Sequence, residues 1–302
     1  MTEESNQNEA STDNSTIEHV LVVTDAPKGG VGKSEFTNHL TSTFRAIGLD
    51  TYIGYDTDGK ARVSKDRDDR FRLIDVTALN DKDAVTELSQ MLGALGTAPV
   101  VVVDPMAHHE ALLRDLFERQ HVFDLRLPKV NGAATILVFP GSDADTVSQA
   151  ADAVNYYRRN HCGRDHRDVR IVAVLNGHLS KGFEFWQGIE ESELVDATVV
   201  LPQLSQKVRD EIIVAAQEMG RPARFDELIR SEDPILSLTA RMFTEDYVLG
   251  VRRQILRNAH FFMPTDLAEQ VMKAVPAEPT PAEVRTGSQI RGSVKFAKKE
   301  RI

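Results

Sequence analysis

The sequence predicts an α/β fold in three layers, with a mainly parallel sheet flanked by helices on both faces. Short apolar runs of strand length alternate with segments in which apolar residues recur at helical spacing. Runs such as "VVVV" at 100–103 are apolar throughout, which is typical of strands covered on both faces of a parallel sheet. A glycine-rich stretch, "PKGGVGKS" at 27–34, joins the first expected strand to the first expected helix.

The first two elements show how each is identified. "HVLVVTDA" (19–26) is an apolar run of strand length. "KSEFTNHLTSTFRAIG" (33–48) places Phe36, Leu40 and Phe44 on one helical face, and Gly48 suits the end of that helix.

The same patterns assign the rest of the chain in order. The further expected strands are 51–56, 70–76, 98–105, 133–141, 168–177 and 196–202. The further expected helices are 81–95, 109–120, 143–159 and 206–220, and most of 225–275 is expected to be helical. Strands separated by helices indicate βαβ units and therefore a parallel sheet.

The 302 residues suffice for one large α/β domain, which we expect to span 17–275. The net charge is −10, but it is unevenly distributed. Residues 1–16 are acidic without any Lys or Arg, residues 276–302 are mostly basic toward their end, and both read as disordered tails. Three prolines mark the end of the folded part: Pro276, Pro279 and Pro281.

Several classes of protein are excluded by composition. No run of 18 apolar residues is present, so no membrane-spanning helix is expected, and the N-terminus lacks the pattern of a signal peptide. The single cysteine, Cys162, excludes an internal disulfide and a cysteine-only metal cluster within one chain. We therefore expect a cytoplasmic protein.

The stretch at 27–34 has the composition of a phosphate-binding loop. Gly29, Gly30, Val31 and Gly32 would expose successive backbone N–H groups, and the helix that follows would add its N-terminus to this anion cradle. A Lys-Ser pair closes the loop. Lys33 would reach the β and γ phosphates of ATP, and the Ser34 hydroxyl would be a ligand of Mg²⁺. The alternative is a glycine turn with a structural role alone.

The loop departs from the general pattern G-x-x-x-x-G-K-[ST], because Pro27 occupies the first position and an extra lysine, Lys28, follows it. In this form it resembles the deviant Walker A ATPases of the ParA/MinD type, and most closely the ParA-like partition branch. The resemblance implies the P-loop NTPase fold and an ATP-dependent homodimer. It further implies that Lys28 reaches the nucleotide of the partner copy, where its charge stabilises phosphoryl transfer.

Further positions match that family over about residues 19–220. In "YDTDGKA", the resemblance implies that Asp56 lies near Mg²⁺ and that Asp58 positions the attacking water. "VVVVDP" matches the Walker B strand, so Asp104 would bind Mg²⁺ through water. "VAVLNG" and "VVLPQLSQ" match the segments around the base, which gives Asn176 and Pro202 as base-binding candidates. The acids could instead cap helices, and Asn-Gly is also a plain turn signal.

Three departures bear on activity. Glu35 follows Ser34, where the family usually has Thr or another small residue, so a carboxylate would sit close to the phosphates unless it turns outward. "DTDGK" and "DPMAHH" replace the usual motifs, so we expect slow hydrolysis that a partner protein stimulates. His108 and His109 are expected at a helix start rather than as metal ligands, since no matching ligand spacing accompanies them.

The expected function is a ParA-like ATPase in DNA or plasmid partition, positioning or conjugative transfer, with the nucleoid as its location if it binds DNA. Clustered arginines would provide non-specific DNA contacts: Arg158, Arg159, Arg164, Arg167 and Arg170, with Arg252, Arg253 and Arg257 on late helices. A MinD-like membrane switch is an alternative, although the tail "GSVKFAKKERI" has too few apolar residues for a stable anchor. A small-molecule ligase or kinase is the other alternative, and it would not need Lys28.

Overall fold

The computed structural model describes residues 16–57, 70–74, 81–161, 169–178, 183, 186–188, 193–219, 228–229 and 236–275. Seven strands are present in these ranges: β1 (His19–Asp25), β2 (Ile53–Asp56), β3 (Phe71–Leu73), β4 (Val100–Asp104), β5 (Gly132–Val138), β6 (Val169–Asn176) and β7 (Ala197–Leu201). They form one sheet in the order β3-β2-β4-β1-β5-β6-β7, and every pairing is parallel.

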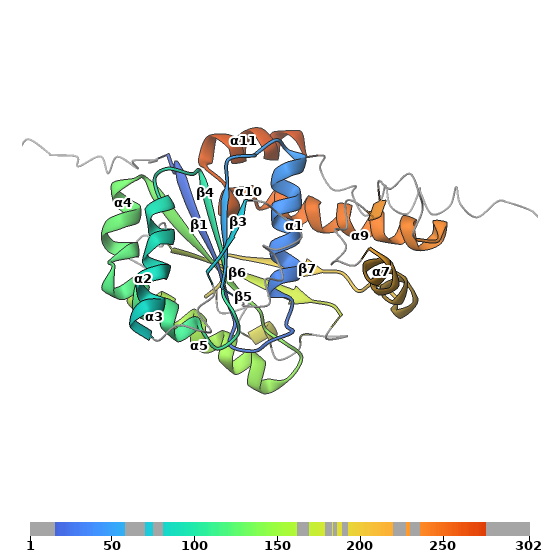
Figure 1. The fold of residues 1–302 in the computed structure, drawn as a ribbon, viewed down its shortest axis with the longest axis horizontal. Helices are drawn as coiled ribbons and strands as arrows, with labels where there is room; N and C mark the ends of the chain where they lie inside the picture. The colour runs from blue at the N-terminus through green and yellow to red at the C-terminus, as the bar shows by residue number, and fades with distance from the viewer. Residues whose placement is uncertain are drawn as a thin grey trace, which may run out of the picture.

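Helices cover both faces of this sheet (Figure 1). The helical segments are α1 (Lys33–Ala46), α2 (Asp81–Met91), η1 (Leu92–Ala94), α3 (Glu110–Arg119), η2 (Val122–Arg126), α4 (Leu127–Lys129), α5 (Ala144–Asn160), α7 (Gln206–Glu218), α9 (Leu238–Arg257), α10 (Ala259–Phe262) and α11 (Thr265–Ala274). The apolar residues of α1, α9, α10 and α11 pack on one face, and those of α2, α3 and α5 pack on the other. The predicted three-layer α/β fold class is confirmed.

Strand β1 lies at the centre of the sheet and connects the two cores. Because successive side chains of a strand point to opposite faces, Val20 and Val22 enter the core beneath α1, while Leu21 and Val23 enter the core beneath α3 and α5. β4 and β5 flank β1, so the carboxyl ends of all three strands meet at one edge.

Helix α1 buries the face that its apolar spacing predicts. Phe36, Leu40 and Phe44 are fully buried, and α9 packs along the same helix. The helix ends at Ala46, two residues earlier than expected, and Gly48 follows with φ of 76°, in the left-handed region that glycine tolerates.

The helical region near the C-terminus consists of α9, α10 and α11 in the described residues, with breaks at Asn258 and at Met263–Pro264. The two ends of the described fold meet here. Ile17, just before β1, donates its N–H to Thr265 Oγ1 at 3.0 Å, and the Thr265 N–H donates to the Ile17 carbonyl at 2.9 Å.

The segment η2–α4, residues 122–129, was not predicted from the sequence. It includes a π-helix, which no simple apolar periodicity marks. The expected tails lie outside the described residues, apart from Thr16.

In the described part of the chain, no helix combines the length and apolar character needed to cross a bilayer.

Candidate functional site: a phosphate-binding loop at the carboxyl edge of the sheet

The loop between β1 and α1 depends on two glycines with positive φ. Gly30 has φ of 79° and Gly32 has φ of 108°, values that residues with a side chain rarely adopt. A Cβ on Gly32 would also lie 2.5 Å from the side-chain nitrogen of Asn176. Gly32 is the N-cap of α1 and has no side chain to cap the first turn. The first-turn N–H groups therefore suit an anion.

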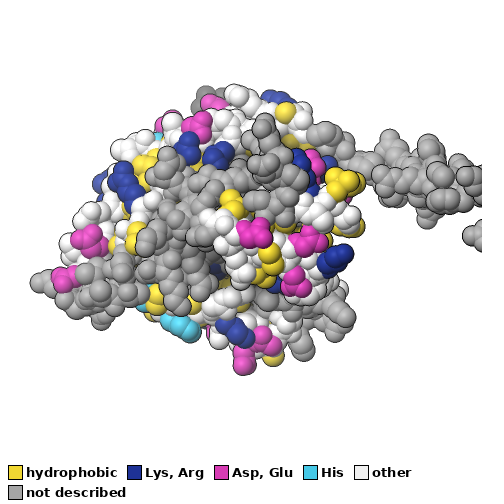
Figure 2. All heavy atoms as spheres, turned by 45° about the vertical axis from the view of Figure 1, so that its right-hand side comes forward, with side chains coloured by type: hydrophobic (Ala, Val, Ile, Leu, Met, Phe, Trp, Pro, Cys, Tyr) yellow, Lys and Arg dark blue, Asp and Glu magenta, His cyan; other side chains and the backbone are white. Residues whose placement is uncertain are grey.

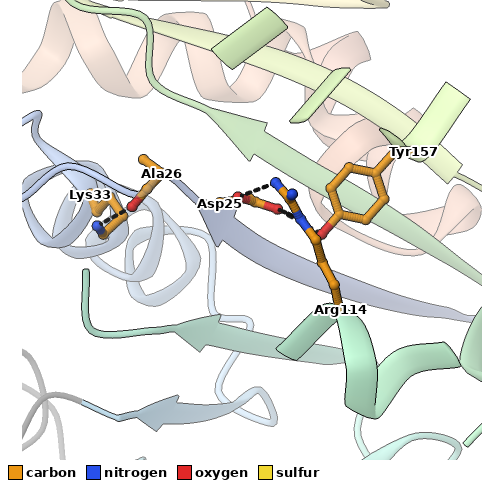
Figure 3. Close-up of polar contacts among 5 residues, drawn as sticks. All are labelled: Asp25, Ala26, Lys33, Arg114 and Tyr157. Carbon is orange, nitrogen blue, oxygen red and sulfur yellow. Dashed lines mark hydrogen bonds and ion pairs between the residues drawn. The ribbon is translucent and has the colours of Figure 1, made fainter. Parts of the chain in front are cut away.

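Lys33 opens α1 and is turned back into the loop. Its Nζ donates to the carbonyl of Ala26 at 2.7 Å (Figure 3). It also donates to the carbonyl of Lys28 at 3.3 Å, and the residue is 8% exposed. The loop thus curls around one ammonium group, which lies beside the backbone where a phosphate would be bound.

Two buried carboxylates lie next to each other at this edge of the sheet, and the charge of Lys33 acts on one of them, Asp104. Asp56 ends β2 and Asp104 ends β4, and the two residues are in register on neighbouring strands. Thr24 donates its hydroxyl to Asp104 Oδ1 at 2.8 Å. Burial, and then the charge of Asp56, raise the pKa of Asp104 to about 6, whereas hydrogen bonds from Ser34 and Thr24 and the charge of Lys33 act in the opposite direction.

This group of oxygens suits Mg²⁺, which usually takes one or two carboxylates together with water and phosphate oxygens. Ser34, Asp56 and Asp104, the three predicted metal ligands, are brought together here. Among the described residues, no cluster of three or more His, Cys, Asp or Glu side chains could hold a metal without such added ligands.

The segments after β2 and β4 are tied to each other. The Thr57 N–H donates to the Asp104 carbonyl at 3.2 Å, and Thr57 Oγ1 accepts from the Met106 N–H at 3.0 Å. Asp58, the predicted water-positioning residue, comes next in the chain and lies outside the described residues. His108 has φ of 71° and His109 is the N-cap of α3, so the two histidines do stand at a helix start.

Lys28 lies on the outer side of the loop and pairs within its own chain. Its Nζ is 3.2 Å from Asp143 Oδ2, and the two side chains are 53% and 50% exposed. Asp143 is the N-cap of α5 and also accepts the Thr146 N–H at 2.9 Å. The Thr146 hydrogen bond first, and Lys28 second, lower the pKa of Asp143.

Glu35 is turned away from the loop and toward the C-terminal helices. Its Oε1 accepts the hydroxyl of Tyr247 at 2.6 Å, and it lies 3.6 Å from Nε2 of His178. The Leu204 N–H points to the other ring nitrogen of His178 at 3.3 Å, which places the proton of a neutral ring on Nε2, facing Glu35. The sequence could not show this contact, because Tyr247 is 212 positions from Glu35.

Asn176 lies beside the loop, and Pro202 lies beside Gly177, the residue after Asn176. Asn176 donates its side-chain N–H to the Val31 carbonyl at 3.3 Å and accepts the His178 N–H at 3.0 Å. The Gly177 N–H donates to the Leu201 carbonyl at 2.8 Å, which brings the start of the Pro202 segment against Asn176–Gly177. The Asx-type contact to His178 also agrees with the turn alternative.

A buried ion pair behind the loop was missed by sequence reasoning. The Asp25 carboxylate accepts hydrogen bonds from Nε and Nη2 of Arg114, at 3.1 and 3.0 Å (Figure 3). It also accepts one from the hydroxyl of Tyr157 at 2.8 Å. Burial raises the pKa of Asp25, and the charge of Arg114 is the largest opposing effect. The sequence did contain one indication of this pair: strand alternation places the charged residue Asp25 on a buried face of β1.

The predicted arginine cluster is partly internal. Arg158 pairs with Asp196 at 2.7 Å, and Arg170 is 7% exposed and donates to the His260 carbonyl. Arg164 and Arg167 lie outside the described residues. On the face drawn in Figure 2, the lysine and arginine side chains of the described residues are scattered among acidic and apolar ones.

No protein-family model and no curated protein matches the sequence. Solved structures do match the fold. The MinD cell division protein of Aquifex aeolicus is 15% identical with a TM-score of 0.37, over 77% of this chain and 97% of that one. A putative plasmid partition protein of Borrelia burgdorferi, bound to AMPPNP, is 13% identical with a TM-score of 0.41, over 77% and 98%.

The septum site-determining protein MinD of Pyrococcus horikoshii, complexed with Mg-ADP, is 12% identical with a TM-score of 0.46, over 80% of this chain and 97% of that one. At such identities the likeness is one of fold.

Proposed function

We propose that this chain is an ATPase of the ParA/MinD type, in which ATP and Mg²⁺ bind at the loop before α1 and hold two copies face to face. The observation that supports this most is the loop itself. Lys33 lies inside its curve, Ser34 is hydrogen-bonded to Asp104, and Asp56 is in register with Asp104 on the neighbouring strand.

The residues present fit both groups. Gly30 and Gly32 adopt the φ values that let the loop curl, and Lys33 would exchange its carbonyl contacts for phosphate oxygens. Ser34, Asp56 and Asp104 would hold Mg²⁺, which supplies neutralising charge to the phosphates. Since Asp104 must lose its proton to act as an anionic ligand, binding of the ion should strengthen as the pH rises past about 6.

Lys28 would serve the nucleotide of the second copy. Its partner within the chain is the exposed Asp143, and exposed ion pairs contribute little to stability. Lys28 is therefore held in place but is readily released. In the proposed dimer its charge would face the phosphates across the interface, and Asp58 would position the attacking water. Turnover would be slow and stimulated by a partner protein.

Size-exclusion chromatography with a non-hydrolysable ATP analogue tests the proposal. Lys28→Ala should bind the analogue but stay monomeric, whereas Lys33→Ala should not bind it. Lys129→Ala is the matched control, because Lys129 is exposed on α4, which precedes β5 at the opposite edge of the sheet. A dimer of undiminished affinity in Lys28→Ala would contradict the trans role, and binding retained in Lys33→Ala would contradict the site.

The role in DNA partition is proposed from the motif resemblance. With Arg158 and Arg170 engaged internally, DNA contacts would depend on exposed residues such as Arg159 and Arg253. A DNA-retardation titration at two salt concentrations is the test. Retardation by the ATP-bound form that weakens with salt supports the role, and none at either concentration would favour a small-molecule kinase or ligase.

A further inference from the structure

Glu35 occupies a helix position that normally reaches back toward the N-cap. With Gly32 as N-cap, Lys33, Ser34 and Glu35 are the first three helical residues of α1. A Glu at the third position commonly accepts a hydrogen bond from the N-cap backbone N–H. Here that N–H belongs to the phosphate-binding loop, so a carboxylate in this position would compete with a phosphate for the same donors and would repel it.

The described structure directs the carboxylate elsewhere. Glu35 Oε1 accepts the Tyr247 hydroxyl at 2.6 Å, so it is held toward α9. Tyr247 is 4% exposed, and its ring packs edge-on against His39 at 5.1 Å and tilted against His178 at 5.8 Å. Burial and the charge of Glu35 keep the pKa of Tyr247 well above its usual value, so the hydroxyl stays a donor.

Positive and polar groups around Glu35 act in the same direction. His178 presents Nε2 to the carboxylate at 3.6 Å, and Arg209 on α7 lies close enough to affect the pKa of both His178 and Tyr247. These groups belong to α7, α9 and the segment after β6. Tyr247 is the member that makes a short hydrogen bond.

We propose that Tyr247 is a positioning residue for nucleotide binding: its hydroxyl keeps the Glu35 carboxylate off the phosphate-binding loop, so that the C-terminal helix α9 sets the affinity of the loop for polyphosphates. This inference rests on the proposed nucleotide site. It assigns to α9, more than 200 residues along the chain from the loop, a specific electrostatic task.

Tyr247→Phe removes the hydroxyl and keeps the ring that packs on His39 and His178. Isothermal titration calorimetry should show about tenfold weaker binding of ADP and of the non-hydrolysable ATP analogue, since hydrogen bonds to charged groups are among the stronger ones. Glu35→Gln should bind at least as tightly as wild type. The double variant should bind like Glu35→Gln alone, because no charge remains at position 35 to be released.

Tyr156→Phe is the matched control. Like Tyr247, Tyr156 donates its hydroxyl to a carboxylate, in this case Glu118 at a distance of 2.5 Å, and this pair does not involve the loop. It should leave binding unchanged. Unaltered affinity in Tyr247→Phe would overturn the assignment. A loss that persists in the double variant would overturn it as well, because the hydroxyl would then act independently of the charge of Glu35. A wild-type chain that binds neither nucleotide would overturn the proposed function together with this inference.

Discussion

Asp104 is folded into a position that favours its neutral form. It is 3% exposed and in register with Asp56, and these two conditions raise its pKa from 3.8 to about 6. Hydrogen bonds from Ser34 and Thr24 offset the effect in part. At neutral pH the folded protein therefore carries an electrostatic cost that a divalent cation between the carboxylates would relieve.

Asp104→Asn should stabilise the protein in the absence of Mg²⁺ and nucleotide, and more so at higher pH. Between 3.8 and about 6 the folded state holds a proton that the unfolded chain has lost, so the free energy of unfolding of wild type falls as the pH rises. The full penalty is about 3 kcal/mol at most. Urea unfolding of both proteins at about pH 5 and about pH 7.5 checks this; a constant difference between them would contradict it.

The side chains that sequence could identify are those defined by local spacing. Lys33 and Ser34 follow from the loop, and Asp104 follows from its place at the end of an apolar strand. Tyr247 and Arg114 could not be found this way, because their partners are 212 and 89 positions distant and no motif links them. Such pairs are set by packing between helices and strands.

Asp25, Arg114 and Tyr157 join three elements behind the loop. Asp25 is the last residue of β1, Arg114 lies on α3 and Tyr157 on α5. The guanidinium of Arg114 also lies 5.6 Å from the centre of the Tyr157 ring. Because the Asp25 side chain is almost fully buried, removing either Asp25 or Arg114 leaves the other as an unpaired charge, which lowers the stability of the fold.

Arg114→Met should lower the free energy of unfolding by about 3–5 kcal/mol at neutral pH. The loss should be smaller at about pH 5, because Asp25, whose pKa burial already raises, can then be protonated. Arg119→Met on the same helix removes an exposed pair with Asp115 and should cost no more than about 0.5 kcal/mol. Chemical unfolding at both pH values measures this, and equal losses in the two variants would refute it.

Most helices and strands could be predicted because each has its own apolar pattern. In the described part of the chain, the five long helices before residue 220 and the seven strands lie within the expected ranges or close to them. The segment 122–129 could not be predicted in this way. Leu125 of its π-helix is exposed, and the residue before the helix, His121, has a φ of 48°. Its conformation comes from the contacts of Val122, Phe123 and Leu127 with the core.

Assembly of two copies would require Lys28 to leave Asp143. Both side chains lie at the carboxyl edge of the sheet, one on the loop after β1 and the other at the start of α5. Asp143 has a second task as the N-cap of α5, and asparagine caps helices about as well as aspartate. The two roles of Asp143 can therefore be separated by one substitution.

Asp143→Asn should strengthen the ATP-dependent dimer several-fold, since it keeps the cap and frees Lys28 from its ion pair. Sedimentation equilibrium with the non-hydrolysable analogue measures the dissociation constant. Adding Lys28→Ala should cancel the gain. If the dimer is no tighter in the single variant, the ion pair does not restrain Lys28.

A parallel sheet could be predicted from the alternation of strands and helices, but the order of its strands could not. Strands β1, β4 and β5 are similarly apolar, and their placement at the centre depends on how the connecting helices cross the sheet. For the same reason, the run of arginines around Arg158 and Arg170 suggested a surface patch, whereas both guanidiniums are held by other segments of the fold.

The pair of hydrogen bonds between Ile17 and Thr265 has a consequence for the growing polypeptide at the ribosome. β1 is made first, yet the backbone groups just ahead of it find their partners only when residue 265 has emerged from the exit tunnel. Phe261, Phe262 and Met263, which complete the core over the sheet, arrive in the same interval. Residue 265 must therefore have left the exit tunnel before the backbone ahead of the central strand has these partners, and chaperones can engage the strand until then.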